Sequence, residues 1–474
     1  MIGFQPKAEH DLYSETLAPV EYNKREVGYN GLGIVWFGAA VQISGFITIT
    51  PMLQYYTIGE LVWIFLIGQA ILGLVCFVIQ DIGLKYGISF ATSITASFGP
   101  FGGKIAGLIR VLPNLVFIGT NGFMGATALN MATIALFGFD NIWFAIILNG
   151  LLVLFVTLKG VKGISIFSTL ATPVLAFMGI YMFYVLFKEY HVSFSDIKDL
   201  GRLSGTTRFW LYPFGAIVGK MGAFAIGFND VARDCTVRHG VKKSGYIHLL
   251  VSLLWNVPAF MFYSLLGCCA LVIVPGMQGS EVLGHLTNLV AGNNKLFIGI
   301  FGLFIFAAQL STNTAANLLP AILCMCGLAP KRIKPIPAGI GFTAVALLVV
   351  RAWTLGNALS DILAFFGLAA GPIITIVAID YYYFRKRKYS LDDIYKTKGK
   401  YYYWHGINPA AMIGYGIGTA AGYMAGDYSF FASLLVTAAA YILLAKYFGK
   451  KYPAMIEETA GDVVFKKEDL EAKA

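Results

Sequence analysis

Charged side chains are scarce in this sequence. Of its 474 residues, only 13% are Asp, Glu, Lys or Arg, whereas 57% are hydrophobic. A water-soluble protein of this length has a surface that so few polar groups cannot cover. The composition therefore excludes an ordinary soluble domain and predicts a protein with most of its surface in lipid.

The groups that enzymes use are also rare in the apolar segments. The six cysteines follow no metal-ligand spacing, no histidine lies near the middle of an apolar stretch, and no nucleotide-binding loop is present. None of the 25 acidic residues lies near the middle of such a stretch, so paired catalytic carboxylates are missing as well. These absences argue against a membrane enzyme, a metal centre and a histidine proton relay.

Long apolar stretches are what the sequence does contain. A helix needs about 20 mainly apolar residues to cross the hydrocarbon core of a membrane. Twelve stretches qualify, at residues 29–52, 60–82, 106–136, 140–158, 164–187, 211–230, 248–274, 296–326, 336–353, 357–383, 408–426 and 429–447. The sequence therefore predicts an all-α polytopic membrane protein with twelve transmembrane helices.

Positive charge is distributed unevenly among the connections. Most of the 35 Lys and Arg residues fall in the terminal segments and in every second connection. Cytoplasmic loops collect positive charge, so we expect both termini to be cytoplasmic, in a bacterial inner or plasma membrane. The net charge of +10 then reflects topology, and nucleic-acid binding is not expected. The basic run at 385–388, which follows three tyrosines, is typical of an anchor at the membrane interface.

The twelve spans divide into two candidate repeats. Each repeat has an odd number of spans, one to five and six to ten, so the second would be inverted relative to the first. Glycine and polar residues interrupt the first span of each repeat, around Gln42 and Gly45 and around Gly219 and Gly222. Matched interruptions of this kind point to the binding site of a transporter. Close packing of glycine-rich membrane helices is the alternative explanation.

Span eight concentrates small polar side chains on neighbouring turns of one helix. Ser311 and Thr312 bring hydroxyl groups, and Asn313 and Asn317 bring carboxamides. Hydroxyl and carbonyl oxygens are hard ligands suited to sodium, and carbonyls of a broken first span would complete such a site. Hydrogen bonding between helices explains the same residues without an ion. The residues alone leave both interpretations open.

Four motifs resemble those of one transporter family. They are GAAVQISG at 38–45, SITASFGPFGGKIAGLIRVLPNLVFIGTNGFMGATAL at 93–129, GFNDVAR at 227–233 and AQLSTNTAAN at 308–317. They are similar to motifs of the nucleobase:cation symporter-1 family, which includes cytosine, purine and hydantoin permeases. The resemblance implies a LeuT-like fold, with two inverted repeats of five helices, two further carboxyl-terminal helices, and breaks in helices one and six.

The same resemblance implies roles for particular residues. A sodium ion would be held by the carbonyls of Gly38, Val41 and Ala308 and the hydroxyls of Ser311 and Thr312. The substrate pocket would be lined by Gln42, Phe117, Asn121, Met221 and Asn317. Carboxamides suit the polar edge of a planar heterocycle, and an aromatic ring stacks on its face. The family often has larger aromatics at 117 and 221 and Gln at 121, so we expect a smaller pocket here.

Lys220 lies about halfway along the sixth span, where the family usually has a small or polar residue. An ammonium group at this depth is costly, so a functional role is the default reading and snorkelling to the interface is the alternative. Either the substrate carries a negative charge that pairs with Lys220, or burial keeps the lysine neutral and it takes up a proton in each cycle. We favour the anionic substrate because sodium would already supply the coupling ion.

These observations together predict a secondary active symporter that imports a small nucleobase-like or related heterocycle with sodium by alternating access. The alternatives are a proton-coupled symporter that uses Lys220 and a passive facilitator. The expected partners are the solute and membrane lipid, without nucleic acid or an obligatory protein partner. The predicted segments are a cytoplasmic tail at 1–27, repeats at 28–190 and 211–388 joined by an extracellular loop at 191–210, a cytoplasmic loop at 389–407, two helices at 408–449 and a cytoplasmic tail at 450–474.

Overall fold

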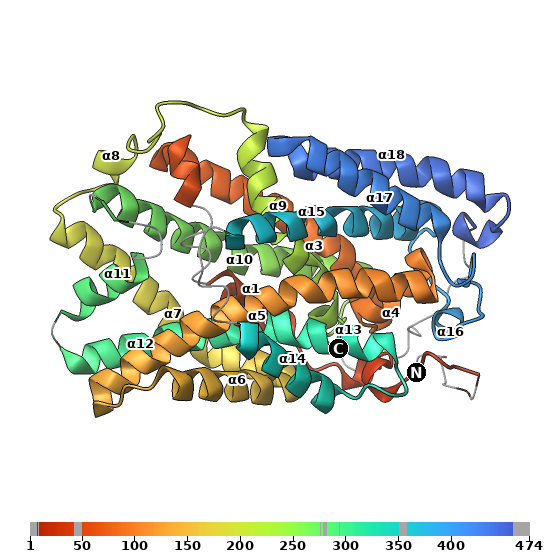
Figure 1. Ribbon diagram of the computed structural model, residues 1–474, viewed down its shortest axis with the longest axis horizontal. Coiled ribbons are helices and arrows are strands. Elements are labelled where there is room, and N and C mark those ends of the chain that lie inside the picture. The colour runs from red at the N-terminus through yellow and green to blue at the C-terminus, as the bar shows by residue number, and fades with distance from the viewer. Residues whose placement is uncertain are drawn as a thin grey trace.

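The computed structural model of the chain describes residues 7, 9–41, 50–274, 276–277, 282–292, 294–349 and 358–457. Within these ranges the protein is helical, and its β pairing is limited to three isolated bridges. Most of the long helices run side by side along the longest axis of the molecule (Figure 1). The predicted all-α class is confirmed.

The helices follow one another through short connections. The first eight are α1 (Tyr29–Ala40), α3 (Ile58–Tyr86), α4 (Phe90–Phe98), α5 (Pro100–Phe137), α6 (Ile142–Leu158), α7 (Gly160–Glu189), α8 (Phe194–Ile197) and α9 (Leu211–Ala232). Next come α10 (Val241–Ile273), α11 (Val282–Ala291), α12 (Lys295–Thr312), α13 (Leu319–Leu328), α14 (Pro335–Val349), α15 (Ala358–Ala378), α16 (Leu391–Ile394), α17 (Pro409–Met424) and α18 (Ser429–Gly449). Two π-helices continue α12 and α15, namely η4 (Asn313–Leu318) and η6 (Ile379–Phe384).

Short 3₁₀ helices complete the described secondary structure. They are η1 (Glu15–Leu17), η2 (Tyr22–Lys24), η3 (Thr50–Gln54), η7 (Gly426–Tyr428) and η8 (Pro453–Met455). The first two lie in the amino-terminal tail, so part of this polar segment is ordered against the helices.

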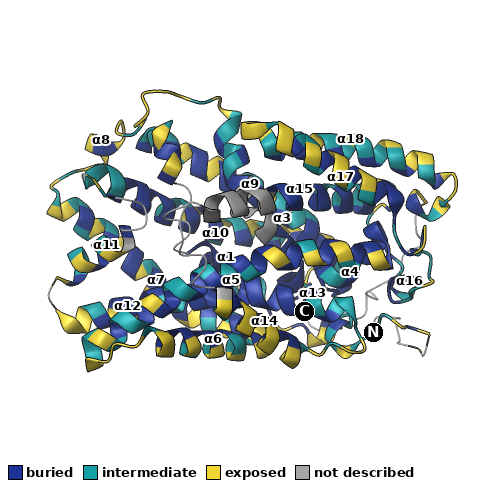
Figure 2. Ribbon diagram, viewed as in Figure 1, coloured by how far each residue is buried: buried dark blue, intermediate teal, exposed yellow. Residues whose placement is uncertain are grey.

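Several helices have the length and composition needed to cross a membrane. Six qualify among the described residues, covering Ile58–Tyr86, Pro100–Phe137, Gly160–Glu189, Lys242–Ile273, Lys295–Leu328 and Gly426–Gly449. Large apolar side chains are exposed on the outer faces of the bundle, including Leu170 at 72% and Leu348 at 82% (Figure 2). Lipid accommodates such side chains, so the chain is a multi-pass membrane protein. The count of twelve crossings stays a prediction.

The helix α9 differs from one sequence prediction. Its backbone is helical from Leu211 to Ala232, so the predicted break around Gly219 and Gly222 is not observed. Glycine lowers helix propensity by about 1 kcal/mol relative to alanine. Breaking a helix inside a membrane also leaves backbone groups without partners, at a cost of several kcal/mol each. The larger penalty explains why the glycines alone do not interrupt α9.

The first predicted span ends its helix early. The helix α1 stops at Ala40, and Val41 leaves the helical region with φ −82° and ψ 71°. Gln42, Ser44 and Gly45, which carry the predicted interruption, lie outside the described residues. The chain resumes in η3, at the end of the predicted span.

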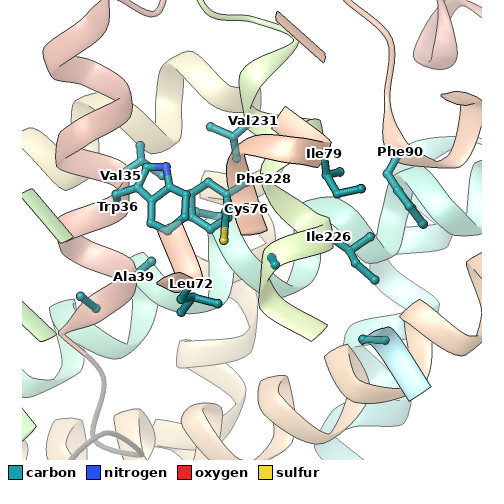
Figure 3. Packing of buried hydrophobic residues seen from close by; sticks show 14 of the residues in the cluster. Val35, Trp36, Ala39, Leu72, Cys76, Ile79, Phe90, Ile226, Phe228 and Val231 are labelled. Carbon is teal, nitrogen blue, oxygen red and sulfur yellow. The ribbon is translucent and has the colours of Figure 1, made fainter. Parts of the chain in front are cut away.

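The core joins the first and sixth spans directly. The Trp36 ring on α1 stacks on the Phe228 ring on α9, with centroids 3.6 Å apart and planes 25° apart. Leu72 and Cys76 of α3 pack beside this pair (Figure 3). Elsewhere α3 packs along α9, α1 along α10, and α5 along α12. These contacts set where the polar residues of α1, α5, α9 and η4 can meet.

The basic run at 385–388 is partly buried, contrary to its interpretation as an interfacial anchor. Arg385 is fully buried and its Nε donates to Asp380 Oδ2 at 2.8 Å. Arg387 forms two hydrogen bonds with Asp81 on α3, at 3.0 and 2.8 Å. The guanidinium groups therefore hold η6 against its neighbours. Lys386, which folds over the Tyr383 ring, still fits an interfacial position.

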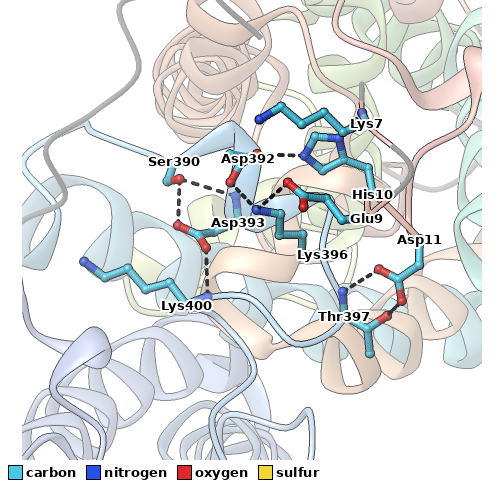
Figure 4. A network of polar contacts seen from close by, with 10 residues as sticks. All are labelled: Lys7, Glu9, His10, Asp11, Ser390, Asp392, Asp393, Lys396, Thr397 and Lys400. Atoms are coloured by element: carbon cyan, nitrogen blue, oxygen red, sulfur yellow. Dashed lines mark hydrogen bonds and ion pairs between the residues drawn. The ribbon is translucent and has the colours of Figure 1, made fainter. Parts of the chain in front are cut away.

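The amino-terminal tail is bound to the loop that carries α16 (Figure 4). His10 Nε2 lies 2.7 Å from Asp392 Oδ1, and Asp11 accepts a hydrogen bond from the Thr397 backbone at 2.8 Å. Lys396 contacts both Asp392 and Glu9. Its ammonium group, through a hydrogen bond, lowers the pKa of Asp392. Two polar segments that are distant in sequence therefore form one ordered surface.

Candidate functional site

The π-helix η4 lies where the elements with predicted site residues meet. It contacts α1, α5 and α9, and α1 also contacts α12. A π-helix has a wider turn than an α-helix, and such turns are frequent at functional sites. The arrangement brings the polar residues of span eight next to the carboxyl-terminal end of α1.

Thr312 joins α12 to the end of α1. Its Oγ1 lies 3.0 Å from the Gly38 carbonyl oxygen and 3.2 Å from the Ala308 carbonyl oxygen. A hydroxyl has one proton, so it can donate fully to only one of these acceptors at a time. Three buried oxygen atoms with a single shared proton form an environment that a cation would stabilise.

Ser311 forms the second contact of this region. Its Oγ lies 3.0 Å from Ser168 Oγ on α7. A Cβ at Gly38 would collide with Ser311 Oγ, so the glycine permits the close approach of α1 and α12. Ser168 was not predicted as a site residue because a lone serine in an apolar span carries no distinctive signal.

The predicted sodium residues are thus largely brought together. Gly38, Ala308, Ser311 and Thr312 belong to one connected group of buried residues. Val41 directly follows the last residue of α1, and its non-helical backbone frees its carbonyl from the helix. The carboxyl-terminal end of a helix carries partial negative charge, which favours a cation there.

The predicted substrate residues on α5 and η4 lie on elements that pack together. Phe117 and Asn121 are one helical turn apart on α5, and therefore lie on one face. Asn121 is fully buried, and neither of its amide atoms has a hydrogen-bond partner among the described residues. Asn317 Nδ2 donates to Asn313 Oδ1 at 2.9 Å. An unpaired buried carboxamide is expected where a polar ligand binds.

The other predicted substrate residues have no described side-chain geometry. Gln42 lies outside the described residues. Lys220 and Met221 are in the helical backbone of α9, but their side chains are outside the description. Since α9 contacts η4, their backbone lies on an element that borders the site.

Arg110 is a buried cation that the sequence only located inside a span. It lies on α5 and is 2% exposed. Its Nη2 donates to the Ala316 carbonyl at 3.1 Å, and its Nη1 donates to Asn114. In a regular helix the Ala316 carbonyl would bond to the N–H of residue 320, which is proline and has none. Arg110 therefore satisfies the carbonyl that Pro320 frees and stabilises η4 against α5.

Comparisons with known proteins match this arrangement. A family model described as "Permease for cytosine/purines, uracil, thiamine, allantoin" matches residues 19–448. The hydantoin permease of Microbacterium maritypicum is 28% identical, covering 94% of this chain and 91% of the relative. The allantoin permease of Bacillus subtilis is 27% identical, covering 92% of this chain and 93% of the relative.

A solved structure shares the fold over almost its whole length. Mhp1, a nucleobase-cation-symport-1 family transporter, was solved in a closed conformation with bromovinylhydantoin bound. It has a TM-score of 0.88 at 27% identity, covering 97% of this chain and 100% of that chain. The inward-facing conformation of Mhp1 has a TM-score of 0.82. The chain therefore belongs to the nucleobase:cation symporter family of cytosine, purine, uracil, thiamine and allantoin permeases, and it is a transporter rather than an enzyme.

Proposed function

We propose that this transporter is a symporter that imports a small nucleobase-like heterocycle together with sodium by alternating access. The observation that carries the proposal is the group of buried oxygens at the end of α1, where Thr312 Oγ1 lies within 3.2 Å of both the Gly38 and Ala308 carbonyls. Relatives named hydantoin permease and allantoin permease support a planar heterocycle as the solute.

Sodium has a simple role in this arrangement. The ion is held by the carbonyls of Gly38, Val41 and Ala308 and the hydroxyls of Ser311 and Thr312. These groups come from two helices, so the ion binds tightly only when α1 lies against α12. The ion therefore favours the conformation that completes the neighbouring substrate pocket, and the substrate in turn favours sodium binding.

The substrate pocket combines stacking with hydrogen bonding. The Phe117 ring stacks on one face of the heterocycle, while the carboxamides of Asn121, Asn317 and Gln42 bind its polar edge. Met221 packs against the ring with a flexible side chain. The full burial of Asn121 makes this recognition selective, because a ligand without matching groups would leave its amide unpaired.

Lys220 would pair with a negative charge on the substrate. The reason is its depth: no acidic residue in the sequence lies near the middle of a predicted span. An anionic heterocycle therefore supplies the missing charge. The alternative use of Lys220 is reversible protonation, which would make the protein a proton-coupled symporter.

The proposed topology follows the family fold. Twelve helices form inverted repeats at 28–190 and 211–388, followed by two helices at 408–449. The connecting loop at 191–210 is extracellular, and the loop at 389–407 and the tails at 1–27 and 450–474 are cytoplasmic. The break in the first span places Val41 and Gln42 at the shared site. The membrane is the bacterial inner or plasma membrane.

A ligand-binding screen tests the proposed function. Purified protein is titrated with uracil, cytosine, allantoin, a hydantoin, urate and orotate, each in sodium chloride and in choline chloride at equal ionic strength. We expect tighter binding of at least one ligand in sodium, and a preference for the anionic members if Lys220 acts as proposed. Equal affinity of every ligand in the two salts would refute sodium coupling. Affinity that follows pH instead would favour protonation of Lys220.

A further inference from the structure

A group of buried carboxamides lies where α5, α6 and the α12–η4 segment meet. Asn149 on α6 is 2% exposed, and Gln309 and Asn313 are each 1% exposed. Asn149 Oδ1, Asn313 Nδ2 and both amide atoms of Gln309 have no hydrogen-bond partner within the described part of the chain. Buried polar atoms are normally paired, so this group is expected to bind something polar or to join up through water.

Two glycines on α5 make room for this group. Asn149 Nδ2 donates to the Gly122 carbonyl at 2.7 Å. A Cβ placed at Gly122 would lie 3.6 Å from Asn149 Nδ2 and 3.8 Å from Asn313 Nδ2. A Cβ at Gly125 would lie 3.2 Å from Gln309 Cβ. The amides of Asn149 and Asn313 therefore border the same point of α5, one residue beyond Asn121.

The unpaired atoms of Asn149 and Asn313 are complementary. Asn313 has a free donor in Nδ2, and Asn149 has a free acceptor in Oδ1, counting partners among the described residues. Asn313 Oδ1 is already the acceptor for Asn317 Nδ2 at 2.9 Å. One water molecule between Asn149 Oδ1 and Asn313 Nδ2 would complete a chain from the Gly122 carbonyl to Asn317.

This chain fixes the orientation of the Asn317 amide. Asn149 is oriented by donating to a backbone carbonyl, so its Oδ1 can only accept. Asn313 must then turn its Nδ2 toward Asn149 and its Oδ1 toward Asn317. The result is that Asn317 uses one N–H within the protein and keeps its Oδ1 for a donor on the ligand.

We propose that Asn149, on a helix outside the predicted pocket, is a positioning residue that selects solutes by fixing the amide orientation of Asn317. The proposal rests on the proposed function, because it assigns Asn317 to substrate binding. It adds a specificity determinant from α6, which supplies none of the predicted site residues.

The test compares Asn149→Leu with Thr157→Val as a matched control. Thr157 is buried on the same helix, and its Oγ1 bonds to the Val153 carbonyl of that helix at 2.7 Å. The probes are a hydantoin and its N-methylated analogues, each of which lacks one N–H donor. The dissociation constant of each probe is measured in sodium and in choline.

In the wild type, methylation of the N–H that meets Asn317 should weaken binding. In Asn149→Leu we expect this discrimination to fall by about 3- to 10-fold, the value of one hydrogen bond, while sodium dependence is retained. Thr157→Val should keep the wild-type ratio. An unchanged ratio in a folded Asn149→Leu protein, even with uniformly weaker binding, would overturn the positioning role. A wild type that binds no heterocycle in either salt would overturn the proposed function, and the positioning role with it.

A second variant keeps the test decisive if Asn149→Leu does not fold. Gly122→Ala adds a methyl group at ordinary contact distance from the two amide nitrogens, 3.6 and 3.8 Å away. It should therefore preserve the fold while excluding a water from between Asn149 and Asn313. We expect the same loss of discrimination, and a wild-type ratio in Gly122→Ala would contradict the relay.

Discussion

The Thr312→Val substitution tests the proposed ion site most locally. Valine has nearly the shape of threonine but lacks the hydroxyl that lies 3.0 Å from the Gly38 carbonyl and 3.2 Å from the Ala308 carbonyl. The change removes one of five proposed ligands of sodium without creating a large cavity. Losing an interaction with a charged group costs about 1.5–3 kcal/mol, so sodium affinity should fall by about 10- to 100-fold.

The size of the expected effect follows from linkage. Sodium at ten times its dissociation constant stabilises the conformation that binds it by about 1.4 kcal/mol. A tenfold weaker site reduces this value to about 0.4 kcal/mol, and a hundredfold weaker site reduces it below about 0.1 kcal/mol. If sodium binds only the substrate-competent conformation, the sodium-dependent gain in ligand affinity should fall from about tenfold to twofold or less.

Isothermal titration of the bound heterocycle at several sodium concentrations measures this gain, with choline holding ionic strength constant. Thr437→Val is the matched control, because Thr437 is also buried and its Oγ1 bonds to the Ser433 carbonyl four residues earlier on α18, at 2.6 Å. The control should keep the full sodium effect. A Thr312→Val protein with an undiminished sodium effect would show that the oxygens around Gly38 do not hold the ion.

Three further predictions concern charged groups. Lys220→Met should abolish binding of anionic heterocycles and spare neutral ones, and equal binding of both kinds by the variant and the wild type would exclude Lys220 from recognition. Asp380→Asn leaves the fully buried Arg385 without its anion, so the free energy of unfolding should fall by about 3–5 kcal/mol, measured by denaturation in detergent, while ligand selectivity is unchanged. Lys396→Met should speed proteolysis of the amino-terminal tail by a few-fold, as expected for an exposed pair. Because the pKa of Asp392 is lowered in the folded protein, this tail contact should hold above the ordinary pKa and be lost as the pH falls through the lowered one.

The sequence predicted the helical class well because its strongest signal is apolar length. Every predicted span overlaps a described helix, and the boundaries differ by several residues, as for α5, which begins at Pro100 rather than 106. The continuity of α9 was not predicted, because glycine content records the ease of breaking a helix but not the cost of doing so in lipid. The π-helices were missed for a related reason. Pro320 signals a freed carbonyl, but its partner Arg110 lies 206 residues away in sequence.

The candidate site was predicted where residues form motifs and missed where they act singly. The run from Ala308 to Asn317 was recognised because several polar residues stand together in an apolar helix. Ser168 and Asn149 each stand among apolar neighbours, and only their tertiary contacts distinguish them. The basic run at 385–388 shows the opposite error, since composition suggested exposure whereas Arg385 is paired with a carboxylate inside the protein.

The central claim is that a sodium gradient drives this transporter to concentrate a heterocycle. Uptake of a radiolabelled ligand identified in the binding screen is measured in proteoliposomes, with sodium outside only and with equal sodium on both sides. The account predicts transient accumulation above the external concentration in the first case and simple equilibration in the second. Uptake that never exceeds equilibrium under the sodium gradient would contradict the account and identify a passive facilitator.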